Sequence, residues 1–511
     1  MTRSRLLLAS AAAATLALPG CTVGPNYVAP QLPTPPAFVS PQAAPPPGQA
    51  IDPAQWWSAF GDPILDRLVT RALANGPDIR TATSRVREAR YQEIVAGAVN
   101  KPTVSGLAGY SRLSFSNNVG FGGGASGASA GGSSAGGASG SSGSSGGALS
   151  GSSIGVFSLG FDASWELDLF GGGRRQREEA REQTEAAVWN RRDAAVTLAA
   201  EVANGYFMLR SDQSQQAIIN DELVRQRRAL EIAGNQALVG LTPQVDVVRQ
   251  RAAITSTEAR IEPLRADEQV RIHAIAILLG AAPGDLTGEL SAPATELGAA
   301  PAIPAGLPSD LLRRRADVRA AERQLAAATA DIGVATAQLY PSLSLTGLAT
   351  LASSGLSNLI SSNSLQTVGL GNAMFPVIDW GRRRATVGLR REEREQRYIS
   401  YQQTVLGALR DVEDSLAQLD TERRRNATLR RAVVDAEETA RSVEGQYRTG
   451  LTAQDPLLNA EANVLSAREQ VVGSDSQLRQ MTASLFKAIG GGWETLPDVP
   501  GADKRPSQPL R

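Results

Sequence analysis

Few side chains in this sequence could carry out covalent or metal chemistry. The 511 residues include one cysteine, Cys21, and one histidine, His273. A single cysteine excludes an intramolecular disulfide and a cysteine metal cluster, and no nucleophile stands with a base at a spacing typical of catalysis. The sequence therefore predicts no enzyme, no metal site and no cofactor, and Cys21 is the residue whose chemistry needs an explanation.

Cys21 follows a segment typical of a signal peptide. Two arginines precede an apolar run over 6–18, and this run is too short to span about 30 Å of hydrocarbon. The stretch Leu18-Pro19-Gly20-Cys21 resembles a lipobox, so we predict a signal peptide over 1–20 and an acylated Cys21 as the mature N-terminus. Several acyl chains would hold such a chain stably on a membrane. The next residue, Thr22, is not an acidic retention signal, which favours the outer membrane.

The chain contains one structural plan twice. Gly240-Leu241-Thr242 recurs as Gly450-Leu451-Thr452, a spacing of 210 residues (450 − 240), and Phe170-Gly171 falls on Trp380-Gly381 at the same spacing. Upstream, Asp78-Ile79-Arg80 matches Asp317-Val318-Arg319 at a spacing of 239 (317 − 78). A Gly/Ser/Ala tract at about 120–153 accounts for the difference, so the first copy carries a longer loop.

Each copy inserts a β-hairpin between long helices. Predicted strands lie at about 103–118 and 154–166 in the first copy, and at about 342–352 and 364–376 in the second. The strand over 154–166 alternates most cleanly: Phe157, Leu159 and Phe161 share one face, whereas Asp162 and Glu166 share the other. A soluble sheet would alternate too, but the chain offers no other strands to complete one, and a membrane barrel strand has the same pattern.

Long proline-free helical sequence follows each hairpin, from about 174 to 238 and from about 382 to 448. Each stretch corresponds to a helix of about 100 Å, and its charges exclude a membrane span. Gly240 and Gly450 each permit the left-handed residue that ends a helix. We expect Thr242 to cap the first return helix and Pro263 to kink it.

Composition sets the remaining boundaries. A Pro-rich N-terminal arm covers 21–54, with a disordered linker as the alternative for its distal part. The first helix–hairpin–helix repeat covers 55–282, a Pro/Gly/Ala-rich linker 283–308, the second repeat 309–490 and a flexible tail 491–511. The 51 basic and 51 acidic residues balance, which gives no support for nucleic-acid binding.

Four strands cannot close a membrane barrel, because outer-membrane barrels begin at eight strands and open edges are not tolerated in lipid. Three copies would supply twelve. The sequence therefore predicts a mixed α+β membrane protein made of a duplicated helix–β-hairpin–helix unit, in which a trimeric 12-stranded β-barrel is continued by a long periplasmic α-helical barrel.

The sequence also resembles a known family. The segments Cys21-Thr22-Val23-Gly24-Pro25, Ala316-Asp317-Val318-Arg319 and Tyr340-Pro341-Ser342-Leu343-Ser344-Leu345 resemble the TolC-like outer-membrane factors, in particular their lipoprotein (NodT-type) branch. The resemblance covers essentially the whole mature chain. It implies a homotrimeric exit channel that conducts small toxic compounds outward from a periplasmic adaptor protein and an inner-membrane pump, usually of the resistance–nodulation–division class.

The resemblance also implies where such a channel would close. Asp455 and Asn459 match the periplasmic gate positions, and their spacing places them on one helix face; Asp455 could equally cap its helix. The resemblance further implies that six residues form the adaptor-docking tips: Gly240, Leu241, Thr242, Gly450, Leu451 and Thr452.

The main alternative is a periplasmic, lipid-anchored adaptor or scaffold protein built on helical hairpins. An adaptor would carry one hairpin between compact β-domains, whereas this sequence has two hairpins and almost no other β sequence. The composition therefore favours the channel.

Overall fold

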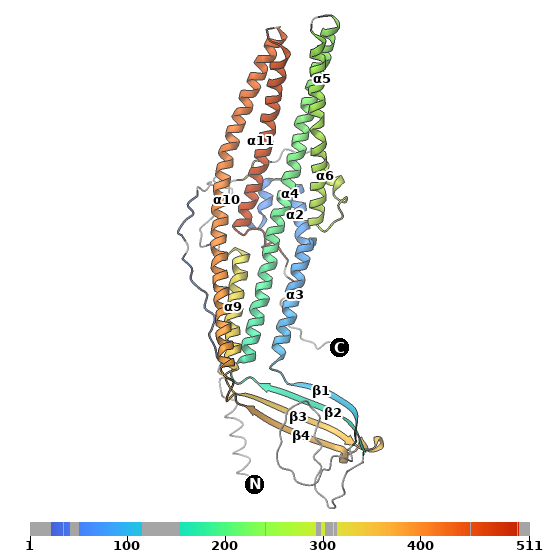
Figure 1. Ribbon diagram of the computed structural model, residues 1–511, viewed down its shortest axis with the longest axis vertical. Coiled ribbons are helices and arrows are strands. Elements are labelled where there is room, and N and C mark those ends of the chain that lie inside the picture. The colour runs from blue at the N-terminus through green and yellow to red at the C-terminus, as the bar shows by residue number, and fades with distance from the viewer. Residues whose placement is uncertain are drawn as a thin grey trace, which may run out of the picture. The chain divides into compact units, whose positions relative to one another are not determined.

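Figure 1 shows the computed structural model of the chain. It describes residues 22–33, 35–40, 51–114, 153–240, 242–292, 298–301, 310, 314–449, 451–497 and 499. The predicted signal peptide, Cys21, Leu241, Gly450 and nearly all of the Gly/Ser/Ala tract lie outside these residues. The chain divides into two compact units. One combines residues up to 24 with 97–175 and 333–386, and the other contains 25–96, 176–332 and the chain from 387 onward.

The first unit is built on a four-stranded antiparallel sheet. Its strands are β1 (Thr103–Ser114), β2 (Ser153–Leu167), β3 (Ser342–Ser353) and β4 (Leu365–Met374), in the order β1-β2-β3-β4. Figure 1 shows the two hairpins side by side. Two short 3₁₀ turns, η2 (Leu356–Asn358) and η3 (Ser362–Ser364), connect β3 to β4. The four strands correspond to those expected from the alternating sequence.

The strand register fixes which residues share a face of this sheet. Phe161 of β2 lies opposite Gly106 of β1 and Ala349 of β3, and Ala349 lies opposite Thr367 of β4. The row next to it contains Asp162. We call the face with Phe161 the apolar face and the face with Asp162 the polar face. Every strand therefore contributes alternate residues to two chemically different surfaces, as its period of two requires.

The second unit is mainly helical. The long helices α4 (Gly172–Leu238) and α10 (Arg382–Arg448) contain 67 residues each, and both begin in the first unit. Helices α3 (Pro77–Ala98) and α9 (Ala316–Ala337) contain 22 residues each. The shorter elements are η1 (Pro53–Phe60), α2 (Pro63–Asn75) and α7 (Thr287–Leu290).

The two return helices differ. The second one, α11 (Gln454–Ala488), is continuous, whereas the first is divided into α5 (Gln244–Ala259) and α6 (Ile261–Leu278). The kink expected at Pro263 thus falls at Arg260. A proline ring clashes with the carbonyl four residues earlier and lacks an N–H to bond with it, so the regular hydrogen bonding ends one turn before Pro263.

The main hydrophobic core joins the start of the folded chain to its last helix. The Trp56 side chain is fully buried and stacks on Phe486 of α11, with ring centroids 5.0 Å apart. Asp62 caps α2 as predicted, because its Oδ1 accepts hydrogen bonds from the Ile64 and Leu65 amides. The same carboxylate accepts a 2.5 Å bond from the Tyr206 hydroxyl of α4.

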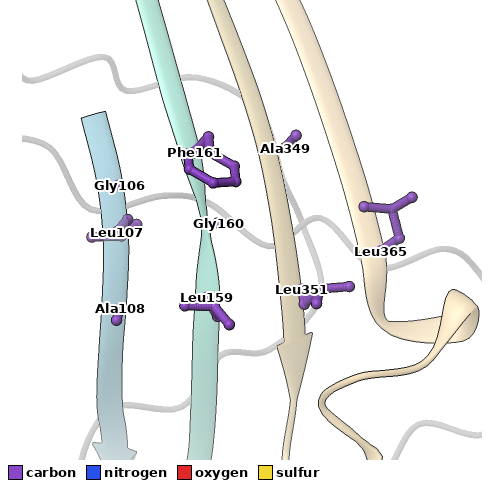
Figure 2. Close-up of a pocket in the computed structure, with 9 residues that line it drawn as sticks. All are labelled: Gly106, Leu107, Ala108, Leu159, Gly160, Phe161, Ala349, Leu351 and Leu365. Atoms are coloured by element: carbon purple, nitrogen blue, oxygen red, sulfur yellow. The ribbon is translucent and has the colours of Figure 1, made fainter. Parts of the chain in front are cut away.

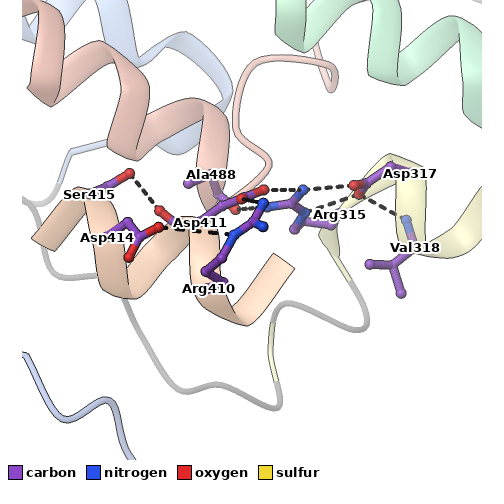
Figure 3. Close-up of polar contacts among 8 residues, drawn as sticks. All are labelled: Arg315, Asp317, Val318, Arg410, Asp411, Asp414, Ser415 and Ala488. Atoms are coloured by element: carbon purple, nitrogen blue, oxygen red, sulfur yellow. Dashed lines mark hydrogen bonds and ion pairs between the residues drawn. The ribbon is translucent and has the colours of Figure 1, made fainter. Parts of the chain in front are cut away.

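Arg315 joins the start of α9, the middle of α10 and the end of α11 (Figure 3). Its guanidinium donates two hydrogen bonds to Asp317 at the start of α9, of 3.0 and 2.7 Å, and one of 3.2 Å to Asp411 of α10. A fourth bond, of 2.9 Å, goes to the Ala488 carbonyl at the end of α11. A planar guanidinium suits this role because its donors have fixed directions.

The described part of the N-terminal arm is packed, as an arm lying on the body would be. In the first unit, Val23 donates its amide to the Phe170 carbonyl at 3.1 Å, and the Val23 carbonyl accepts a bond of the same length from Arg175. Gly24 has a φ of +90° and lies so close to Gly333 that a Cβ would clash. In the second unit, the Glu413 carboxylate accepts hydrogen bonds from the main-chain amides of Val39 and Ser40.

The chain after 490 differs from the flexible tail that we predicted. Over 491–497 it packs on the helices, and Trp493 meets the Trp189 ring edge to face at 5.5 Å. The Trp493 indole N–H also donates to the Arg314 carbonyl, and the Pro497 carbonyl accepts a bond from Arg191. Burial of the Trp493 ring gains more free energy than is lost by covering the polar residues around it, and this holds the segment in place.

Candidate functional site

Of the two helical turns predicted as docking tips, the first differs from our expectation in its cap. Gly240, with a φ of +79°, follows α4 as predicted. Thr242 does not cap α5, because its hydroxyl donates backward to the Ala233 carbonyl at 3.4 Å. At the second turn, Leu451 is 80% exposed and Thr452 is half-buried. Both turns therefore offer exposed or half-exposed side chains to a partner.

Asp455 and Asn459 are both exposed on α11. Asp455 does not cap its helix, which begins one residue earlier with no side-chain cap. Instead its carboxylate lies 3.4 Å from the Arg249 guanidinium of α5, and Arg249 lies equally close to Asp246. The candidate gate residue thus forms an ion pair between the two helical hairpins.

Beside this exposed pair lies a buried link that the sequence reasoning missed. Gln454, only 4% exposed, donates from Nε2 to Oε1 of Gln250 at 2.9 Å. The Gln250 amide in turn donates to the main-chain carbonyl of Gln226 on α4 at 3.2 Å. We call this chain of side-chain amides the glutamine link. It could not be read from spacing, because its members lie on three helices and glutamine is a common surface residue.

Next to the glutamine link, charged residues surround a cavity of about 240 Å³. Its charged lining comes from three helices: Glu222 and Arg225 of α4, Glu437, Arg441 and Glu444 of α10, and Glu461 and Arg468 of α11. Two pairs neutralise each other directly, Arg225 with Glu222 and Arg468 with Glu437, each at 2.6 Å.

Glu461 is the carboxylate in this cavity whose ionisation is most strongly opposed. Burial is the main cause, and the negative charges of Glu222 and Glu444 add to it, so that the pKa of Glu461 rises to about 7 despite the opposing effect of Arg225. Glu461 can therefore change its charge near neutral pH.

In the first unit, the apolar face of the sheet forms a groove of about 550 Å³ (Figure 2). Its lining is almost entirely apolar, and the large side chains of Phe161, Leu365 and Leu159 on this face are 64, 55 and 43% exposed. The polar face carries the exposed carboxylates of Asp162 and Glu166. This arrangement suits a sheet with lipid on one side and water on the other.

No chemistry beyond these contacts is evident in the described residues. Within them, no group of three or more histidine, cysteine or acidic side chains is placed to hold a metal ion. Among the described helices, none is both long enough and apolar enough to cross a membrane.

Comparison with known proteins identifies the family. The model of the outer membrane efflux protein family matches residues 68–281 and 307–491. The chain belongs to this family.

Individual relatives match over nearly their whole length. The antibiotic efflux pump outer membrane protein ArpC of Pseudomonas putida is 30% identical over 500 residues, covering 96% of each chain. Nodulation protein T of Rhizobium leguminosarum bv. trifolii is 29% identical over 94% of this chain and 96% of its own. The solved structure of the outer-membrane channel OprN superimposes with a TM-score of 0.80 at 30% identity, covering 93% of this chain and 100% of that one.

These findings confirm the family inferred from the sequence motifs and place the protein in the outer membrane as an efflux exit channel. They favour the channel over the adaptor alternative, since the solved neighbour, which matches 93% of this chain, is an outer-membrane channel.

Proposed function

We propose that three copies of this chain join their four-stranded sheets into one 12-stranded barrel, and that the paired helical hairpins form its closable periplasmic entrance. The observation that supports this most strongly is the sheet itself. It has two unpaired edge strands, β1 and β4, and an exposed apolar face. An open edge cannot remain in hydrocarbon, so the edges must pair with other copies.

The purified protein in mild detergent tests this assembly. We expect a trimer that dissociates on heating and that conducts ions after reconstitution in a planar bilayer. A protein that stays monomeric and carries no current would contradict the proposal.

We further propose that the mature chain is anchored by acylated Cys21. Its support is the packing of the residues that follow, because Thr22 and Gly24 meet Gly171 and Gly333 in close contacts that only glycine allows. Mass spectrometry of the same sample should show an acylated N-terminal Cys21, and Cys21→Ala should remove the acyl mass. An unmodified cysteine in the wild-type chain would exclude the anchor.

The entrance is closed, in our proposal, by contacts between the first hairpin and the second. The glutamine link and the Arg249–Asp455 ion pair both join these hairpins. The tips at Gly240, Leu241 and Thr242 and at Gly450, Leu451 and Thr452 would bind a periplasmic adaptor, which separates the hairpins so that solutes pass from an inner-membrane pump. The relatives' names suggest antibiotics as one class of solute.

This gate should respond to pH through Glu461. The pKa of Glu461 is raised from an ordinary 4.5 to about 7 by burial between the hairpins, so the closed arrangement binds the proton more tightly than an open one. Below about pH 4.5 Glu461 is neutral in both arrangements and costs nothing. From there up to about pH 7, ionisation of Glu461 increasingly opposes closure. Above pH 7, Glu461 is ionised in both arrangements, and its charge destabilises the closed one to the full extent.

We therefore expect channel conductance to increase, by about threefold or more, between pH 5.5 and pH 8. The measurement is single-channel recording of wild type and Glu461→Gln. The glutamine mimics the neutral acid and should stay in the low-conductance state at both values. A variant that kept the wild-type pH response would show that Glu461 does not control the entrance.

A further inference from the structure

The polar face of the sheet carries an apolar strip on its last strand, β4, and beside it on β3. On β1, β2 and β3 the residues facing this side in the middle of the sheet are mostly serine, threonine, glycine or acidic. On β4 the corresponding residues include Val368, Leu370 and Met374, which are 44, 62 and 60% exposed. The β4 residues between them, which face the apolar side, are small, Gly369 and Gly371 among them. Over residues 368–374, the larger apolar side chains of β4 therefore point to the side on which the other strands are polar.

The register places this strip on the same surface as a carboxylate. Asp162 of β2 lies opposite Leu348 of β3, and Leu348 lies opposite Val368 of β4. Neighbouring strands are about 4.8 Å apart, so Asp162 and Val368 stand roughly 10 Å from each other in one row. We call Leu348, Val368, Leu370 and Met374 the apolar strip.

Lipid does not explain the strip. The polar face bears the exposed carboxylates of Asp162 and Glu166, and placing an ionised carboxylate in hydrocarbon is strongly unfavourable. In the proposed trimer this face must therefore line the water-filled pore. Exposed apolar side chains there add nothing to folding stability, because they are not removed from water.

We propose that the apolar strip and Asp162 form a solute-selecting wall inside the barrel, repeated three times, that favours amphiphilic cations. The strip contacts the apolar body of the solute and Asp162 attracts its positive charge. This inference rests on the proposed trimeric barrel and names the class of solute that the pore favours.

The first test establishes which way the strip faces. Leu370→Cys and Gly371→Cys alter adjacent residues on opposite faces of β4, and the trimer is reconstituted in liposomes. A charged, water-soluble thiol reagent should modify the cysteine at 370 and leave that at 371 unmodified. The reverse pattern would place the strip in lipid and overturn the proposal.

The second test measures selection. Tetraphenylphosphonium, an apolar cation, and tetramethylammonium, a small one, are added from the barrel side during single-channel recording. In the nearly isosteric variant Val368→Thr/Leu370→Asn, the block by tetraphenylphosphonium should shorten about fivefold, since apolar contact area is lost. Asn372→Leu fills the gap between Leu370 and Met374 and should lengthen each blocking event by tetraphenylphosphonium. Asp162→Asn should weaken the block by both cations.

The outcomes separate this inference from the proposed function. Normal ion current with a tetraphenylphosphonium block that is the same in all variants would overturn the solute-selecting wall and leave the channel intact. Absence of current and of trimer in the wild type would overturn the channel, and the wall with it. Thr346→Ser, a polar exchange opposite Leu370, is the matched control and should behave as wild type.

Discussion

Replacing Gln454 by alanine should open the channel in the absence of any partner. The buried Gln454 amide bonds Gln250 across the two hairpins, and its loss leaves a buried polar group without its bond. Such a loss costs about 1–3 kcal/mol in each chain. With three chains sharing one entrance, the total is roughly 3 kcal/mol or more, which shifts the balance between closed and open entrances about a hundredfold. Single-channel recording should show the gain as a large rise in conductance.

Two variants show whether this effect belongs to the buried link. Gln470→Ala makes the same change on the same helix, at an exposed glutamine that bonds only Ser466 within α11, and should leave conductance unchanged. Arg249→Ala removes the ion pair with Asp455, whose side chains are 47 and 57% exposed. Exposed pairs contribute about 0–1 kcal/mol, so its effect should be small. If Arg249→Ala opened the channel more than Gln454→Ala, the exposed pair would be the principal gate.

The second large effect concerns stability. Trp56→Ala should lower the free energy of unfolding by about 3–5 kcal/mol, because a fully buried ring that stacks on Phe486 is replaced by a cavity. Denaturant titration followed by the helical circular dichroism signal measures this change. Trp56→Phe keeps the stacked ring and should cost much less.

Trp380→Ala is the matched control for this substitution. The Trp380 side chain is 97% exposed in the single chain, so its removal creates no cavity. If Trp56→Ala cost no more than Trp380→Ala, the junction between η1 and α11 would not be the centre of the core.

Much of the fold could be predicted because its signals are local. Alternation in Phe157–Trp165 gave a strand, and glycine with threonine at 240–242 marked a helical turn. The long proline-free stretches gave α4 and α10 nearly to the residue. The N-terminal cap at Asp62 was equally predictable, because Pro63 follows it directly.

The contacts of the candidate gate were less predictable, since they depend on helices packed together from distant parts of the sequence. The sequence around Asp455 is compatible with a cap or a gate residue, but its partner Arg249 is 206 positions away (455 − 249). Gln250 and Gln454 have no local signature at all. The prediction of a flexible tail was wrong over 491–497 for a related reason. Trp493 lies in a polar, proline-rich stretch, and only the position of Trp189 explains why it packs.

The difference between the two return helices has a mechanical consequence. Because α11 is unbroken over 35 residues, it can act as a stiff lever of about 50 Å. A rotation of about 5° at its base, where Arg315 holds the Ala488 carbonyl, would displace its far end by roughly 4 Å. The first return helix has a joint at Arg260 and can absorb such a displacement by bending. Small movements near the base would thus produce a large displacement at the far end of α11, whereas the first return helix would bend at Arg260 and its far end would move less.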